Sequence, residues 1–451
     1  MRQSELIMNL RSIKELFKYP TALAGVIIIL ILLGISVYAV VTIPYDKAIS
    51  LWRGSEEDWY KNPKLAGPVW FNWFRTDKLP ETIDLTADSP GVTKKVQQAG
   101  STTIINFTFD IPYNYNSFSD DIVIFFKSNF SVKAPFVTLS WITPGGVKTR
   151  LANFALKDQL SYRLGQDNVL MQKLNGVAPN VALFAGPTYD SPTPVKGTYQ
   201  LLIEGAAFEK DSVYTPELIL YGKLSGWAGT DNLRRDISLA LLWGTPVALL
   251  FGLLAAVGTS LSQLIIAAVS TWFGGWVDTV IQRITEVNLV LPFLPILIMI
   301  GTFYSRSLFL MLGVVIVLGI FGSGIKTYRA VFLQVKESPY IEAARAYGTG
   351  NTRIIFQYMI PRLIPLLIPQ FITLVPSYVF LEASLAVLGL GDPSLPTWGK
   401  LIDDAYVNGA LFQGWYYWVL EPSALLMVTG LAFASVGYAM DRIFNPRLRE
   451  Q

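Results

Sequence analysis

The sequence contains no cysteine and no histidine among its 451 residues. The absence of cysteine excludes disulfide bonds and thiolate metal sites. The absence of histidine removes the commonest general base and metal ligand, and it excludes every Ser-His or Cys-His catalytic arrangement. A catalytic site would have to use carboxylates, lysine or tyrosine alone. We therefore expect this chain to carry neither a catalytic site nor a metal site.

Charged residues are also scarce, at 15% of the chain, whereas 52% of the residues are hydrophobic and the mean hydropathy is +0.41. This balance is too apolar for an ordinary soluble protein. The net charge of +3 is small and does not indicate nucleic-acid binding. Apolar runs of about 18 or more residues are long enough to cross a hydrocarbon layer roughly 30 Å thick. Because several such runs occur, we predict a multi-spanning membrane protein.

The first apolar run, residues 21–43, follows the basic residues Arg11, Lys14 and Lys18. It is longer than the apolar core of a signal peptide, about 7–15 residues, and has no convincing cleavage pattern. We interpret it as a retained transmembrane helix with a cytoplasmic N-terminus, and a signal peptide is the alternative.

Five further apolar runs give six predicted spans in all, and they lie near residues 238–266, 280–303, 307–328, 357–388 and 417–440. From a cytoplasmic N-terminus, this order places both termini inside and the segment after the first span outside. The inner loop carries a cluster of basic residues: Lys326, Arg329, Lys336, Arg345, Arg353 and Arg362. Such a bias toward Lys and Arg is typical of cytoplasmic loops and supports this topology.

The segment 45–228 differs in composition from the spans around it. It has short aromatic and β-branched runs at 102–108, 121–126, 136–142, 198–203 and 217–221, separated by turn residues. This pattern predicts an extracytoplasmic β-sandwich-like domain. Sequons at Asn106 and Asn129 lie on the side where glycosylation would occur.

The inner loop before the fifth span predicts a short helix. Pro339 suits its first turn, the alanine-rich residues 341–346 propagate it, and Gly348 and Gly350 can end it in a left-handed cap. Small alanines allow such a helix to enter a groove on a partner closely, where its glutamate and arginine can form charge-assisted bonds. The alternative is an amphipathic connector lying on the inner surface.

Prolines recur at four-residue intervals in the fifth span, at Pro361, Pro365 and Pro369. Each removes a backbone hydrogen bond and can bend the helix. We expect this helix to be kinked and to line a pathway, and tolerated kinks are the alternative. Pro292 and Pro295 are expected to bend the third span in the same way.

Few ionisable residues fall within the spans. Arg283 and Glu286 lie near the inner end of the third span, and Glu382 lies near the outer end of the fifth. Their positions close to the membrane interfaces favour snorkelling or helix pairing over a proton relay.

The inner loop resembles the EAA loop of binding-protein-dependent ABC importer permeases. Glu342, Ala343, Ala344, Gly348 and Pro361 match that pattern at the expected spacing. The resemblance implies that the short helix, together with Arg345, docks in a cleft of an ATP-hydrolysing subunit and transmits its closure to the membrane helices.

Three further segments resemble the second ("C-type") permease of the dipeptide/oligopeptide branch. Residues 229–236 are similar to its GTD-x-x-GRD run, with Arg234 in place of a glycine. Residues 382–391 and 396–399 resemble its EASL-x-x-LGLG and P-x-WG signatures, and residues 441–449 are like its D-x-x-x-DPRLR ending. The resemblance covers the first helix and nearly everything after Gly229, whereas the β-rich insert is foreign to the ordinary pattern.

The resemblance implies a type I ABC importer permease fold of six transmembrane helices. Its expected parts are residues 1–44 with the first helix, the inserted domain 45–228 and the core permease domain 229–451. The implied partners are a homologous permease, two ABC ATPase subunits, an extracytoplasmic solute-binding protein and membrane lipid. Pro361, Pro365, Pro369 and Glu382 are the candidate pathway or hinge residues.

No nucleotide site is expected in this chain. Residues 319–327 resemble a phosphate-binding loop, but Ile325 separates the last glycine from Lys326, and the run ends a span rather than following a strand. We therefore expect ATP and Mg²⁺ to bind to the partner ATPase subunits.

The substrate remains open among peptides, which the family implies, oligosaccharides and nickel. Two rival functions differ in class. One is a membrane-anchored external enzyme using two of the carboxylates Asp110, Asp120, Asp121 and Glu204, and the other is an ion-coupled secondary transporter. The insert itself is either a spacer or cap, or a docking platform for a binding protein or a lid over the entrance.

Overall fold

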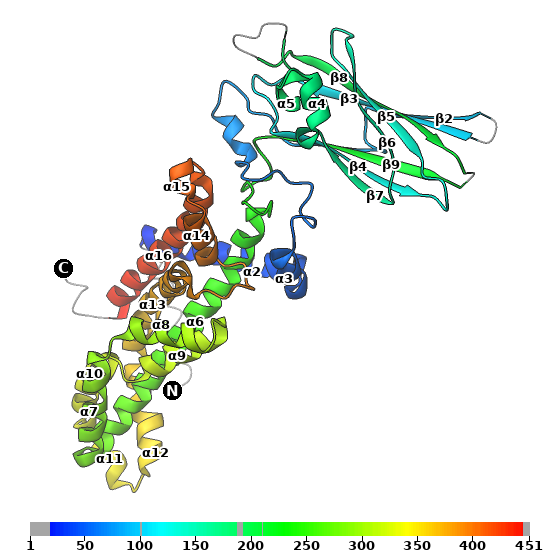
Figure 1. The fold of residues 1–451 in the computed structure, drawn as a ribbon. Coiled ribbons are helices and arrows are strands. Elements are labelled where there is room, and N and C mark those ends of the chain that lie inside the picture. The colour runs from blue at the N-terminus through cyan, green and yellow to red at the C-terminus, as the bar shows by residue number, and fades with distance from the viewer. Residues whose placement is uncertain (1–18, 100–101, 187–192, 210, 445–451) are drawn as a thin grey trace. The chain divides into compact units, whose positions relative to one another are not determined.

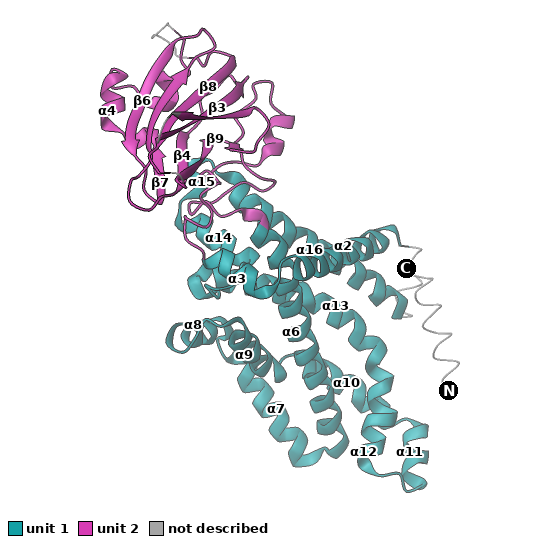
Figure 2. Ribbon diagram, turned by 90° about the vertical axis from the view of Figure 1, so that its right-hand side faces the viewer, with its two compact units in different colours: residues 1–53, 239–451 teal, residues 54–238 magenta. Residues whose placement is uncertain are grey.

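The computed structural model describes residues 19–99, 102–186, 193–209 and 211–444. The chain forms two compact units (Figure 2). The β unit comprises Gly54–Ser238, and the helical unit comprises Met1–Arg53 and Leu239–Gln451.

The β unit has nine strands within its described residues, all paired antiparallel in two sheets (Figure 1). The four-stranded sheet has the order β1-β9-β4-β7, and the five-stranded sheet has the order β2-β3-β8-β5-β6. The strands are β1 (Ile83–Thr86), β2 (Val92–Ala99), β3 (Thr102–Tyr113), β4 (Asp121–Asn129), β5 (Phe136–Ile142), β6 (Lys148–Ala155), β7 (Gln159–Arg163), β8 (Gly197–Ala207) and β9 (Val213–Tyr221). The short helices η1 (Val69–Trp73), η2 (Leu164–Gln166), α4 (Asn168–Lys173) and α5 (Pro179–Ala182) lie in the connections.

The core of the β unit lies between the two sheets. Along β3 and β8, every second residue is buried, as a strand with one face on a core requires. Phe107 and Ile203 from the five-stranded sheet share one buried cluster with Ile124 and Leu218 from the four-stranded sheet. The predicted β-sandwich is thus confirmed.

The expected boundaries of the insert, 45 and 228, differ from those of the β unit. Residues Tyr45–Arg53 form a separate helix, α3, which buries Ala48 and Trp52 and belongs to the helical unit. At the other end, Thr230 accepts a hydrogen bond from the amide of Ala66 (3.0 Å) and donates one to the carbonyl of Pro63 (2.8 Å). These bonds attach the GTD-type run to the β unit, whereas it was predicted to belong to the permease core.

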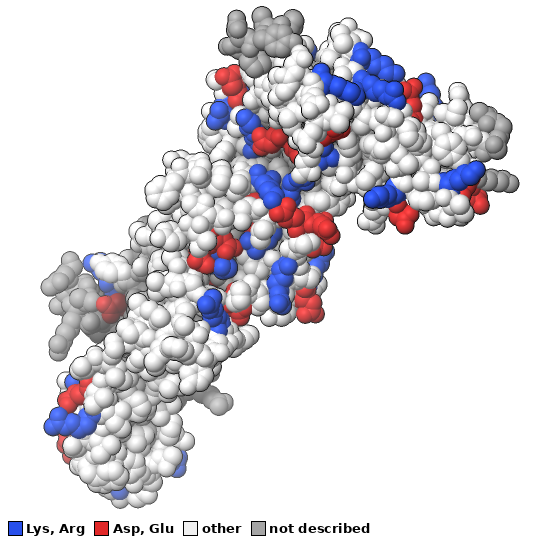
Figure 3. Space-filling model, in the orientation of Figure 1, with Lys and Arg blue, Asp and Glu red and all other residues white. Residues whose placement is uncertain are grey.

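The helical unit contains four helices in its described residues that are long and apolar enough to cross a membrane. They are α2 (Pro20–Thr42), α6 (Ile237–Phe273), the continuous helix Asn351–Leu390 and α16 (Tyr416–Phe444). The continuous helix consists of α12 (Asn351–Arg353), a π-helical segment, α13 (Ile360–Leu385) and a second π-helical segment. The shorter helices α14 (Trp398–Val407) and α15 (Ala410–Gln413) connect it to α16. In Figure 3, the visible surface of the helical unit is mostly uncharged.

The third and fourth predicted spans are not single helices. The third is α7 (Gly275–Val290) and α8 (Phe293–Phe303), bent by 75°, and the fourth is α9 (Leu308–Ile320) and α10 (Gly324–Lys336), bent by 43°. If each bent pair is one span, the described chain has up to six, which agrees with the predicted number.

Each break has a local cause. Leu291, which precedes Pro292, is extended (φ −64°, ψ 133°), because the proline ring disfavours a helical conformation in the residue before it. The second break falls in a glycine-rich turn whose carbonyls accept hydrogen bonds from amide side chains. Asn288 donates to the carbonyls of Leu318 (3.0 Å) and Phe321 (3.2 Å), and Gln263 donates to that of Gly319 (2.7 Å).

Glycines allow the long helices to approach closely. A Cβ atom at Gly25 of α2 would lie 2.6 Å from the carbonyl oxygen of Ala432 in α16. At Gly252 of α6, it would lie 2.9 Å from the carbonyl oxygen of Val375 in α13. Small residues at such crossings are typical of helix packing in membranes.

A buried ion pair stabilises the end of the β unit. Asp231 is completely buried and accepts hydrogen bonds from the amides of Leu233 (2.9 Å) and Arg235 (2.8 Å) and from Nε of Arg235 (2.6 Å). Burial raises the pKa of Asp231, and the guanidinium of Arg235 offsets only part of that rise.

We predict that Arg235→Met destabilises the β unit by roughly 3–5 kcal/mol, because it leaves the Asp231 carboxylate buried without its counter-charge. Denaturant unfolding of the full chain in detergent, followed by the β-sheet circular dichroism signal, measures the effect. Arg150→Met is the matched control, because Arg150 is exposed on β6. Equal stability of the two variants would show that the pair contributes nothing.

Candidate functional site

The predicted coupling helix is present as α11 (Pro339–Ala346), between α10 and α12. Its buried face consists of Ile341 and Ala344, which join a cluster with Trp272 of α6 and Phe332 of α10. The guanidinium of Arg345 lies 4.4 Å from the ring centre of Trp272. Both apolar burial and a cation–π contact therefore fix α11 to the helices behind it.

Gly348 ends α11 in the left-handed conformation, with φ +74°. The amide of Gly348 bonds to the carbonyl of Arg345 (2.9 Å), and that of Thr349 bonds to the carbonyl of Ala344 (3.0 Å). This pair of bonds is a Schellman motif, which favours glycine at the left-handed position. Gly350 has φ −65° and precedes α12, so the second glycine of the expected cap has ordinary backbone geometry.

The opposite face of α11 is exposed. Glu342 and Ala343 lie on it, and Tyr347 directly after the helix is 89% exposed. Among the described residues, no basic group lies within ion-pairing distance of Glu342. This face offers a free carboxylate, a small residue and an aromatic side chain to a partner surface.

A second ion pair, which was not predicted, connects the helices behind α11. Asp278 of α7 forms a salt bridge with Arg329 of α10 (2.5 Å) and accepts a hydrogen bond from Ser270 of α6. Lys336 donates to the carbonyl of Thr271 (2.8 Å). These residues are far apart in sequence and belong to no linear motif, so no pattern indicated them.

Arg283 and Glu286, for which snorkelling or helix pairing was expected, contact each other within one helix. The two side chains form a salt bridge of 2.8 Å on the surface of α7. Lys326 of α10 lies 3.8 Å from the same glutamate, which extends the pair to a second helix.

The proline-rich helix continues through its prolines. Pro361 is exposed, Pro365 is half-buried and Pro369 is buried. Directly before them, residues Ile354–Met359 are π-helical, and the amide of Ile360 bonds to the carbonyl of Ile355. Such π segments are local helix distortions that recur at functional sites.

One face of α13 carries an exposed row of hydroxyl groups, which we call the hydroxyl stripe: Thr373, Ser377 and Ser384. Their spacing of four and seven residues places them on the same side of the helix. This row was not among the predicted residues, although the helical spacing of its hydroxyls is visible in the sequence. Each hydroxyl donates to a carbonyl of the preceding turn of α13: Thr373 to Gln370 (2.9 Å), Ser377 to Thr373 (3.3 Å) and Ser384 to Phe380 (2.7 Å).

Glu382 is 5% exposed near the C-terminal end of α13, and Thr397, directly before α14, lies close to its carboxylate. Next to Thr397, the buried Trp398 donates to the carbonyl of Leu241 in α6 (2.9 Å). A Cβ atom at Gly399 would lie 2.7 Å from Cα of Ala383. The EASL-type and P-x-WG-type segments thus pack against each other and hold α14 on α13.

The predicted residues do not form one site. Pro361 and Glu382 are separated by 21 helical residues, which corresponds to about 32 Å along the axis. The residues predicted to couple to an ATPase lie before one end of α13 and Glu382 lies near the other, so α13 connects them. The predicted D-x-x-x-DPRLR ending lies largely outside the described residues, which stop at Phe444.

The chain resembles known proteins over its helical part. The family of binding-protein-dependent transport system inner membrane components matches residues 248–450. A peptidoglycan transport system permease protein of Agrobacterium fabrum, YejE, is 30% identical over 222 residues, which are 49% of this chain and 57% of that protein.

Two relatives from Bacillus subtilis are named for peptides. The dipeptide transport system permease protein DppC is 29% identical over 224 residues, or 49% of this chain and 69% of that protein. The oligopeptide transport system permease protein OppC is 28% identical over 226 residues, or 50% of this chain and 72% of that protein. Residues 248–450 therefore match a binding-protein-dependent transport system inner membrane component domain, and the helical unit is similar to permeases named for dipeptides and oligopeptides.

Proposed function

We propose that this chain is the transmembrane permease subunit of an ATP-driven importer of di- and oligopeptides, and that it forms half of the translocation pathway. The observation that carries the proposal is the capped helix α11, which is fixed on one face and exposes Glu342 on the other. The peptide relatives support the substrate class. The second half of the pathway would come from a homologous permease, and an extracytoplasmic solute-binding protein would deliver the substrate.

The coupling step follows from how α11 is held. A partner that binds the exposed face and moves would displace α11. Ile341, Ala344 and Arg345, which contact α6 and α10, would transmit this displacement to those helices. Two ATPase subunits, which bind ATP and Mg²⁺, would supply this movement. Pro361, Pro365 and Pro369 would let α13 bend in response, and Glu382 would keep its outer end attached to α14.

We further propose that the hydroxyl stripe faces the pathway, that both termini and α11 are cytoplasmic, and that the β unit is outside. The basic inner loop supports this orientation. Oligosaccharides are the second substrate class. The rival enzyme has little support, because three of its candidate carboxylates have other partners: Asp110 accepts from Gln200 (2.8 Å), while Asp121 and Glu204 each pair with a basic residue at 3.5 Å.

The two loop glycines provide a matched test of coupling. Gly348→Ala is expected to lower peptide-stimulated ATP hydrolysis and transport at least about tenfold, because a Cβ atom at positive φ costs roughly 1–2 kcal/mol and disturbs the cap. Gly350→Ala should be nearly silent, because its φ is ordinary and a Cβ atom there meets open space.

Glu342→Lys should uncouple hydrolysis from transport, with Glu337→Lys as its control. Normal transport in both Gly348→Ala and Glu342→Lys would reject the docking role.

The absence of cysteine makes orientation testable with single thiols. We expect a membrane-impermeant maleimide to label Val132→Cys on intact cells, and to label Tyr347→Cys only after the cells are opened. Both side chains are highly exposed, at 84% and 89%, so a difference reports the side of the membrane. The reverse pattern would invert the topology.

The same approach tests the hydroxyl stripe. Water-soluble thiol reagents should modify Ser377→Cys and Ser384→Cys in the assembled transporter, and transported peptide should slow the reaction. Leu30→Cys, at a 61% exposed apolar position in the middle of α2, should react slowly because lipid covers it. Equal reactivity at all three positions would show that the stripe does not face water.

A further inference from the structure

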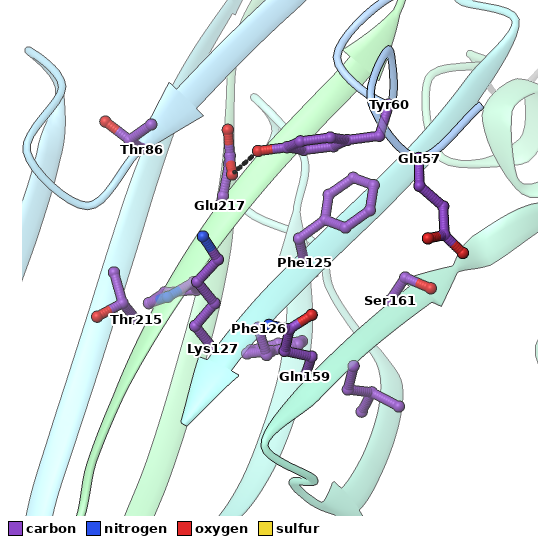
Figure 4. A pocket seen from close by; sticks show the side chains of 12 residues that line it. Glu57, Tyr60, Thr86, Phe125, Phe126, Lys127, Gln159, Ser161, Thr215 and Glu217 are labelled. Atoms are coloured by element: carbon purple, nitrogen blue, oxygen red, sulfur yellow. Dashed lines mark hydrogen bonds between the residues drawn. The ribbon is translucent and has the colours of Figure 1, made fainter. Parts of the chain in front are cut away.

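The β unit contains a pocket of about 510 Å³ on the face of its four-stranded sheet that points away from the core (Figure 4). This volume lies within the range of small-ligand sites, roughly 300–1,000 Å³. Its lining comes from all four strands and from residues 54–64, which we call the strap. None of the transport steps proposed above uses this pocket.

Polar contacts fix the strap to the sheet. The hydroxyl of Tyr60 donates to the carboxylate of Glu217 (3.0 Å), and the carbonyl of Tyr60 accepts from Tyr221. Lys61 forms ion pairs with Asp84 (2.9 Å) and Glu217 (2.5 Å). The pocket wall is therefore tied to both β1 and β9, so the site is largely preformed.

An aromatic pair lines the apolar part of the pocket. The rings of Tyr60 and Phe125 meet edge to face, with centroids 4.7 Å apart. Phe125 is half-buried, which leaves part of its ring open to the pocket. Such a surface suits an apolar or aromatic side chain of a ligand.

Opposite charges without partners flank this aromatic surface. Lys127 lies two residues after Phe125 on the same face of β4, and Glu57 lies on the strap. Among the described residues, neither forms a salt bridge, and Glu217 is already held by Lys61 and Tyr60. In the view of Figure 4, Phe125 stands between Lys127 and Glu57.

Neutral hydrogen-bonding groups complete the lining. Lys127 is opposite Gln159 of β7 and Thr215 of β9 in the strand register, and Phe125 is opposite Ser161. An amide and two hydroxyls are thus available to the carbonyl and N–H groups of a ligand.

We propose that this pocket binds a short peptide with free termini, as a capture site on the permease itself. The ligand ammonium pairs with Glu57, its carboxylate pairs with Lys127, and an apolar side chain packs on Phe125. The choice of peptide rests on the proposed transport function. A neutral oligosaccharide would also stack on the aromatic pair, but it would leave both charges without a partner.

Blocked dipeptides test the two charges separately. The full chain in lipid nanodiscs, without ATP, is titrated calorimetrically with Ala-Phe, N-acetyl-Ala-Phe and Ala-Phe amide. Each blocked form should bind about tenfold or more weakly than Ala-Phe, as expected for the loss of one charge-assisted hydrogen bond. Glu57→Gln should abolish the discrimination against the acetylated form only, and Lys127→Gln that against the amide only.

Controls separate this site from the rest of the molecule. Lys95→Gln and Asp88→Asn replace exposed charges elsewhere on the β unit and should bind like the unmodified chain. Phe125→Ala should weaken all three ligands, and Phe125→Leu, which keeps apolar volume, should weaken them less. The β-sheet circular dichroism signal verifies that each variant is folded.

Three results would overturn the proposal. The first is no binding of Ala-Phe up to about 10 mM, and the second is equal binding of the free and blocked dipeptides. The third is that the unmodified chain binds a glucose trisaccharide but not Ala-Phe, and that Phe125→Ala abolishes the binding of the trisaccharide. Peptide transport with intact coupling in any of these cases would leave the proposed function standing, because the pocket alone would have failed. The proposed function has a separate failure, which is normal coupled transport in both Gly348→Ala and Glu342→Lys.

Discussion

The helical unit depends on the satisfaction of backbone polar groups where no water is available. A hydrocarbon layer offers no hydrogen-bond partner, so a break in a spanning helix is tolerated only where protein supplies the missing bonds. Asn288 and Gln263 do this at the break between α9 and α10 by donating to the carbonyls of Leu318, Gly319 and Phe321. Two amide side chains from α7 and α6 therefore permit the bend and attach it to its neighbours. At the break itself, glycine leaves room for one of these side chains, because a Cβ atom at Gly322 would lie 2.7 Å from Nε2 of Gln263.

The sequence predicts the interior of the sandwich better than its margins. The five strands expected from apolar runs, at 102–108, 121–126, 136–142, 198–203 and 217–221, correspond to β3, β4, β5, β8 and β9, which are the interior strands of the two sheets. The four strands that were not expected, β1, β2, β6 and β7, are the four edges. Edge strands commonly carry polar and charged residues that discourage pairing with other chains, which weakens the alternation on which prediction relies. The sequence Val-Thr-Lys-Lys-Val-Gln-Gln-Ala of β2 shows this directly.

For the candidate functional residues, local sequence patterns were predictable, whereas contacts between residues distant in sequence were not. The helix α11 was predictable because a proline start, an alanine-rich run and a glycine end occur within ten residues. Its attachment was not, because Arg345 and Trp272 are 73 positions apart and Asp278 and Arg329 are 51 apart. The bends in the predicted spans could be predicted only in part. Pro292 indicated the first one, whereas the second depends on Asn288, which no local pattern connects to Phe321.

The hydrogen bonds between Thr230 and the residues Pro63 and Ala66 bring the start and the end of the β unit together. The bridge between Gly67 and Leu224 has the same effect. An inserted domain with adjacent ends leaves the path of the host chain almost unchanged, which is the condition under which insertions are best tolerated. The chain therefore leaves the helical unit and returns to it through neighbouring segments of the β unit. An ancestral permease could have gained it in a single genetic step, and a descendant could lose it, without any of its membrane helices having to be rebuilt.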